Sequence, residues 1–88
     1  MHILIKGRVQ GVGFRYWLQH EAETRGVSGW ARNRRDGSVE AVMSGEPEAI
    51  GDLLTSCAVG PRLADVRDIE RLDELTADCS GFEIRPTV

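Results

Sequence analysis

Apolar residues near the start of the chain alternate with polar ones, as in a β-strand with one buried face. The positions on the predicted buried face are Ile3, Ile5, Gly7 and Val9. Lys6 and Arg8 fall on the opposite face. Residues 10–13 then break the alternation with glycines at two of four positions, which indicates a turn.

The next apolar residues recur at the spacing of an α-helix, i, i+3, i+4 and i+8: Phe14, Trp17, Leu18 and Ala22. This pattern predicts an amphipathic helix that ends near Arg25 and Gly26, since glycine is favoured just past a helix C-terminus. Residues 27–33 predict a second strand and residues 38–44 a returning strand. Asp36-Gly37 between them is a strong hairpin signal.

A second helix is predicted to begin at Pro47, a residue favoured in the first helical turn, and to end at Gly60-Pro61. Its apolar face consists of Ala49, Ile50, Leu53, Leu54 and Cys57. Val66 and Ile69 indicate a further strand whose odd spacing predicts a bulge or an edge position. Phe82 and Ile84 predict a short final strand, which Pro86 ends.

The predicted order is strand, helix, strand, strand, helix, strand, followed by the short extra strand. With right-handed crossovers, this order gives an α+β, ferredoxin-like βαββαβ fold. We therefore expect a two-layer sandwich in which both helices cover one face of an antiparallel sheet.

The length of 88 residues suits one domain, so we expect residues 1–88 to form a single unit. The chain lacks an apolar run long enough for a membrane span and a recognisable signal peptide at its start. These features predict a cytoplasmic protein without a membrane partner. Cys57 and Cys79 lack metal-ligand spacing and are expected to be free thiols.

The formal charge of −3, from 11 basic and 14 acidic residues, argues against nucleic acid as a partner. The basic residues nevertheless gather in the first half of the chain, which suits a small anionic substrate. A solvated charged hairpin would explain Arg34 and Arg35 equally well.

The first candidate for chemistry is the glycine-containing stretch 7–15 between the first strand and the first helix. Such a loop can direct several backbone N–H groups at one anion, and the helix dipole adds positive potential. Arg15 in the first helical turn opposes that dipole, but its guanidinium can bind two phosphate oxygens at once. The stretch lacks the Gly-Lys-Ser/Thr of a nucleotide P-loop, and Tyr16 replaces the third glycine of a dinucleotide motif. A simple tight turn remains the alternative.

The second candidate is Asn33, directly before the predicted hairpin turn. Its carboxamide can donate and accept hydrogen bonds without titrating, which would let it orient a water molecule. Asn is also a common residue at the start of a turn, so a purely structural role stays open. The sequence shows no His/Cys/Asp/Glu cluster at metal-ligand spacing. His2 and His20 are isolated along the chain and expected at the surface, so an obvious general base is missing.

Two segments together resemble the signatures of the acylphosphatase family. These are Gly7-Arg8-Val9-Gln10-Gly11-Val12-Gly13-Phe14-Arg15 and Gly29-Trp30-Ala31-Arg32-Asn33-Arg34-Arg35-Asp36-Gly37-Ser38-Val39-Glu40. The likeness extends over nearly the whole chain and is far more specific than either glycine pattern alone. It implies a ferredoxin-like fold, in agreement with the periodicity.

The resemblance also implies the hydrolysis of acyl phosphates to carboxylate and inorganic phosphate, without a metal or cofactor. The phosphate-binding groups it implies are the amides of Gln10, Gly11, Val12, Gly13 and Phe14 together with the Arg15 side chain. Asn33 would position the attacking water. We expect a monomer that binds inorganic phosphate or sulfate as competing anions. A non-catalytic anion-binding module and an RNA-binding sheet of the same topology are the alternatives.

Overall fold

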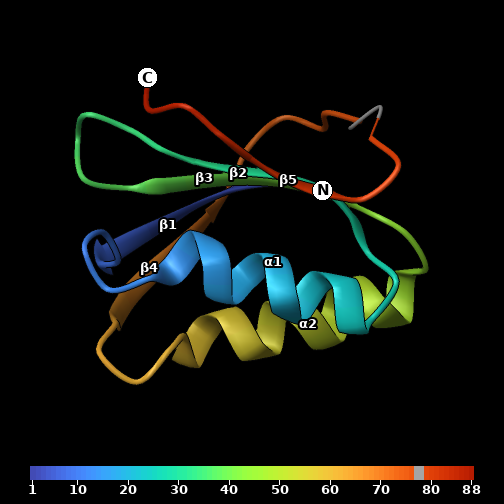
Figure 1. Cartoon of the computed structure of the whole chain (residues 1–88), viewed down its shortest axis with the longest axis horizontal. Helices are drawn as coiled ribbons and strands as arrows, with labels where there is room; N and C mark the ends of the chain where they lie inside the picture. Colours follow the sequence, from blue (N-terminus) through green and yellow to red (C-terminus); the bar gives the residue numbers. More distant parts are fainter. Residues whose placement is uncertain (77–78) are drawn as a thin grey trace.

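The computed structural model describes residues 1–76 and 79–88, and within these residues it contains two helices and a five-stranded sheet. The helices lie side by side on one face of the sheet (Figure 1). The elements in chain order are β1 (His2–Arg8), α1 (Phe14–Thr24), β2 (Ser28–Asn33), β3 (Val39–Ser44), α2 (Pro47–Val59), β4 (Asp65–Arg71) and β5 (Phe82–Arg85). Each predicted element is present within a few residues of its expected bounds.

The strands follow the order β4-β1-β3-β2-β5 across the sheet. All pairs among β1, β2, β3 and β4 are antiparallel, as predicted. β5 instead adds to β2 in parallel, with Gly29 opposite Phe82. The sheet is therefore mixed, because the chain crosses from β4 at one edge to the other edge and enters β5 in the direction of β2.

β4 is both irregular and at an edge, so both explanations offered for its odd spacing are confirmed. Lys6 of β1 pairs with Asp68, but the adjacent Gly7 pairs with Val66. Arg67 is thus the extra residue of a bulge. The bulge shifts the alternation by one position, which lets Val66 and Ile69, three residues apart, pack against the same core.

The core lies between the sheet and the helices. Of the positions predicted from the helical spacing of α1, Phe14, Leu18 and Ala22 are buried and Trp17 is partly buried against the core. α2 buries Leu53 and Cys57. The fully buried side chains on the sheet and on α1 include Ile3, Ile5, Val39, Met43, Phe14 and Leu18. Both cysteines are free, as expected. Burial raises the pKa of the Cys57 thiol to about 12, so it stays protonated at neutral pH and is unreactive.

Neither described helix is long and apolar enough to cross a membrane.

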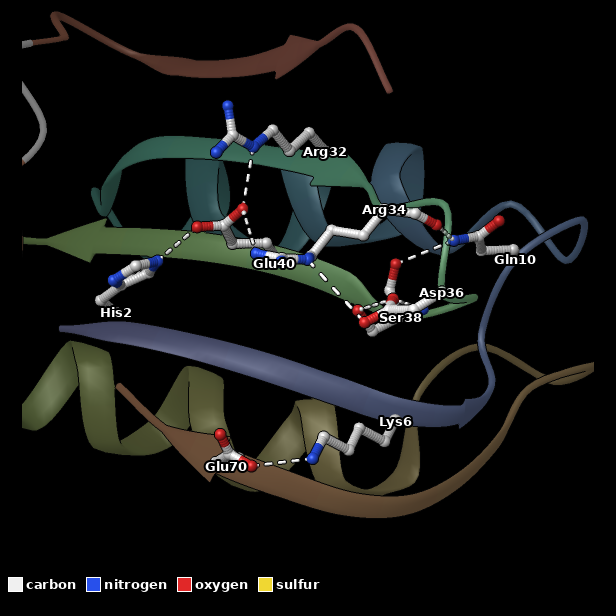
Figure 2. A network of polar contacts seen from close by, with 9 residues as sticks. All are labelled: His2, Lys6, Gln10, Arg32, Arg34, Asp36, Ser38, Glu40 and Glu70. Carbon is white, nitrogen blue, oxygen red and sulfur yellow. Dashed lines mark hydrogen bonds and ion pairs between the residues drawn. The ribbon is translucent and has the colours of Figure 1, made fainter. Parts of the chain in front are cut away.

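The sheet face opposite the helices holds a buried carboxylate. The side chain of Glu40 on β3 is only 4% exposed, and Figure 2 shows the basic side chains around it. One oxygen accepts a hydrogen bond from His2 Nε2 at 2.5 Å. The other accepts from Arg32 Nε at 2.8 Å and from Arg34 at 3.4 Å. His2 is therefore part of a network that links β1, β2 and β3, although the sequence shows it as isolated.

Trp30 extends this face toward the edge of the sheet. Its side chain is buried, and the guanidinium groups of Arg32 and Arg85 each lie 4.8 Å from its ring centroid. Cations at this distance from an indole ring are attracted by its π-electrons. Trp30 is thus a packing residue of the sheet surface, one of the roles considered from the sequence.

Glu40→Gln is predicted to lower the free energy of unfolding by about 2 kcal/mol at neutral pH, the scale of a hydrogen bond to a charged group. Burial disfavours the ionised form of Glu40, but its bonds from His2 and Arg32 outweigh burial and hold its pKa below the usual 4.5. The charge therefore stabilises the fold above pH 4.5, and this contribution is lost as pH falls through the lower, folded-state pKa.

The control is Glu70→Gln on β4, which breaks an exposed ion pair with Lys6 of 2.7 Å. It should cost at most about 1 kcal/mol. Chemical denaturation at neutral and acidic pH measures both changes. An equal cost for the two variants, or a Glu40→Gln deficit that persists unchanged at low pH, would contradict this interpretation.

Candidate active site

The candidate site lies at one end of the sheet, where β1 and β2 both finish. β1 and β2 are each antiparallel to β3, so they run in the same direction and their carboxyl ends meet at the same edge. A pocket of ≈ 140 Å³ opens there. Its lining residues are Val9, Gln10, Gly11, Gly13, Phe14, Arg15, Tyr16 and Asn33.

The loop between β1 and α1 turns sharply at two glycines. Gly11 and Gly13 have φ values of 73° and 76°, in the left-handed region that glycine tolerates best. Gly13 is the N-cap of α1, and no side chain caps this end. The first turn carries no acidic residue either. The free N–H groups and the positive end of the helix dipole are therefore available to an anion.

Arg15 projects from the first turn of α1 and is only partly exposed. Among the described residues that line the pocket, it is the only charged one. The other partly exposed arginines, Arg25, Arg32, Arg34 and Arg85, each pair with a carboxylate. Within residues 1–76 and 79–88, Arg15 has no ion pair. A partly buried guanidinium without a counter-charge favours a bound anion.

Asn33 is the last residue of β2 and pairs with Val39 of β3. Its backbone carbonyl accepts a hydrogen bond from the amide of Val88 at 3.1 Å. This bond fixes the position of the Asn33 backbone. Asn33 lines the pocket, and within the described part of the chain no hydrogen bond to its carboxamide is found. The group is thus available to a water molecule or a ligand.

The pocket gathers almost all residues singled out from the sequence. Val12 is the exception, because its side chain packs against the core, although the prediction concerned its amide. Val9 and Tyr16 line the pocket without having been predicted to do so. Tyr16, 66% exposed, forms part of the rim. Its position directly after Arg15 in the first helical turn was the sequence signal that could have predicted that Tyr16 lines the pocket.

Neither histidine lines the pocket. His20 is exposed on α1, and His2 is bound to Glu40 on the open face of the sheet. In the part of the chain that the structure describes, no three His, Cys, Asp or Glu side chains are grouped to hold a metal ion. The chemistry of the pocket therefore rests on one guanidinium, backbone amides and a carboxamide. Together with the fold, this defines a ferredoxin-like α+β domain with a pocket whose one charged lining residue, among those described, is Arg15.

Known proteins place this domain in a family. The model of the acylphosphatase family matches residues 1–84. The chain is 59% identical to an acylphosphatase of Nitrobacter winogradskyi over 84 residues, which are 96% of this chain and 83% of that one. The crystal structure of acylphosphatase from Bacillus subtilis superposes with a TM-score of 0.85 at 36% identity, covering 96% and 94% of the two chains.

An acylphosphatase from Coxiella burnetii gives a TM-score of 0.89 at 34% identity, covering 96% of this chain and 88% of that one. The chain belongs to the acylphosphatase family. It is thus a hydrolase of acyl phosphates, as the resemblance of its two signature segments implied.

Gly13→Ala is predicted to destabilise the protein by about 1 kcal/mol, because a left-handed φ strains any residue with a Cβ. Gly51→Ala in the middle of α2 is the matched control. A Cβ at either position would meet no atom within 4 Å, so only the backbone conformations differ. Gly51→Ala should stabilise the fold by about 1 kcal/mol, since alanine favours the helix. Chemical denaturation of both variants measures the effects. A Gly13→Ala protein as stable as wild type would show that the turn does not need a left-handed residue.

Proposed function

We propose that the chain hydrolyses acyl phosphates in the pocket at the ends of β1 and β2. The backbone amides of residues 10–14 and the Arg15 side chain would hold the phosphate, and Asn33 would position the attacking water. The observation that carries the proposal is Arg15, which has no ion pair among the described residues and shares one pocket with Asn33 and the start of α1, where no side chain caps the helix. The family gives the reaction class, and these residues supply a means to perform it.

Phosphoryl transfer passes through a loose transition state with charge spread over the three equatorial oxygens. Fixed N–H donors and a guanidinium stabilise this charge without having to reorganise during the reaction. Because the described lining residues include no carboxylate, no like charge in the lining repels the dianionic phosphoryl group in the transition state. Inorganic phosphate and sulfate carry similar oxygens and should compete for the same groups.

The water oxygen forms a bond to phosphorus as the bond between phosphorus and the carboxylate oxygen breaks. The Asn33 carboxamide can accept a hydrogen bond from the water and orient its lone pair toward phosphorus. The leaving carboxylate is a weak base and departs without an acid. A phosphate oxygen of the substrate takes the proton from the water, so the reaction needs no enzymatic base. The positions of His2 and His20 outside the pocket agree with this step.

The proposal extends to a metal-independent, cytoplasmic monomer that acts on small molecules rather than on nucleic acid or membranes. In its support, Arg15 and the loop amides can supply the positive potential that a metal ion would otherwise provide. The formal charge of −3 also disfavours binding to nucleic acid.

Arg15→Ala is predicted to lower kcat/KM for acetyl phosphate by at least about 10²-fold, the usual effect of removing one donor to a developing charge. Inorganic phosphate should inhibit the wild type competitively and this variant hardly at all. Arg71→Ala is the matched control, because Arg71 is exposed and pairs with Ile3, at the opposite end of β1 from the pocket. A folded Arg15→Ala protein with normal turnover and normal phosphate inhibition would overturn the assignment.

Asn33→Ala should lower kcat strongly while leaving the inhibition constant of inorganic phosphate nearly unchanged, since the residue acts on the water. Asn33→Asp should also fail, because a carboxylate repels the anionic substrate. Steady-state kinetics with acetyl phosphate separates the two parameters. If Asn33→Ala raises only KM and the phosphate inhibition constant, then Asn33 is a substrate ligand and the proposed role is wrong.

A further inference from the structure

The side chain of Gln10 connects the glycine loop to the β2–β3 hairpin. Gln10 Nε2 donates a hydrogen bond to the carbonyl oxygen of Arg34 at 2.7 Å and another to that of Ser38 at 2.8 Å. Both bonds are visible in Figure 2, where Gln10 reaches from its loop to the end of the hairpin. Because both partners are carbonyl oxygens, only the NH₂ group of the Gln10 carboxamide can bond to them, and both of its N–H donors are used.

The two carbonyl groups belong to the same turn of the chain. The amide of Arg34 donates to the Ser38 carbonyl at 2.9 Å, and the amide of Gly37 donates to the Arg34 carbonyl at 3.1 Å. Each carbonyl oxygen has a second lone pair, and Gln10 occupies it. The side chain of Gln10 therefore holds the end of the hairpin in a fixed position relative to the loop, at the residue that directly follows Asn33.

From these contacts we infer that the Gln10 side chain is a positioning residue, which sets the placement of Asn33 relative to the phosphate loop. The inference rests on the proposed function, in which the loop holds phosphorus and Asn33 holds the water. Gln10 and Arg34 are 24 residues apart in sequence, and β1 and β2 are not neighbours in the sheet. A misplacement of about 1 Å between reacting groups can cost about 10²-fold in rate.

The role of Gln10 differs from that of a phosphate ligand. The cradle of N–H groups depends on the left-handed glycines and the start of α1, which the Gln10 side chain does not form. Loss of the side-chain amide should therefore impair the alignment of water and phosphorus more than the binding of phosphate itself. A variant that lacks the amide should therefore have a lower kcat and a nearly unchanged inhibition constant for inorganic phosphate.

Gln10→Met replaces the carboxamide by an apolar group of similar length. We expect its kcat for acetyl phosphate to fall at least about 10-fold, part of the loss that misalignment can cause. The inhibition constant of inorganic phosphate should change much less. Gln10→Asn, which keeps the amide but is one methylene shorter, should lose kcat in the same direction and serves if Gln10→Met folds poorly.

Gln19→Met is the matched control. Gln19 Nε2 also donates to a backbone carbonyl, that of Phe82, at 2.8 Å, but it joins α1 to β5 outside the pocket. Its loss removes one such bond, where the loss at Gln10 removes two, and should leave kcat near that of the wild type. Thermal melts of each variant establish that both remain folded.

A double-mutant cycle with Asn33→Ala completes the test, because a residue that acts through Asn33 should have little further effect on kcat once Asn33 is absent. If the wild type is active and Gln10→Met has the same kcat as Gln19→Met, the inference about Gln10 is wrong while the proposed function stands. Fully additive losses with Asn33→Ala, or a phosphate inhibition constant that rises as much as kcat falls, would contradict the inference as well. A wild type that does not hydrolyse acetyl phosphate would instead overturn the proposed function, and the inference with it.

Discussion

The turn from β1 into α1 at Gly11 and Gly13 is the constraint on which the rest of the site depends. Gly13, in the left-handed conformation, is the N-cap at which α1 begins after the short loop that follows β1. Because of the helical periodicity, Phe14 and Leu18 then lie in the core, while Arg15 lines the pocket. The same turn leaves the first amides of the helix uncapped. One backbone feature thus provides the N–H groups, the dipole and the direction of the guanidinium.

The topology of the sheet supplies the other half of the site. Since β1 and β2 both pair with β3 in antiparallel fashion, the loop after β1 and the hairpin after β2 lie at the same end of the sheet. Val39 has Ile5 on one side and Asn33 on the other. The hairpin is fixed from two directions, by Val88 and by Gln10. Asn33 therefore lies at the same pocket as the glycine loop, although it is distant in sequence.

The sequence predicted the elements well because the periodicity of each is local and strong. It also singled out Arg15 and Asn33, since the resemblance of two segments added information that a single glycine pattern lacks. The parallel pairing of β5 was not predicted, because a four-residue strand carries no signal for its partner. The contacts of Gln10 and of His2 with Glu40 were also missed. They join residues 24–38 positions apart, and nothing local marks a side chain for a partner so distant.

Titration of isotope-labelled protein with inorganic phosphate, followed by backbone amide chemical shifts, tests the placement of the site most directly. The largest changes should fall on residues 10–15, with a shift in the side-chain amide of Asn33. Arg32 and Arg85, which both lie against the Trp30 ring, offer guanidinium groups away from the pocket, although each already pairs with a carboxylate. If the main changes appeared there and the glycine loop stayed unchanged, phosphate would bind elsewhere and the proposed site would be contradicted.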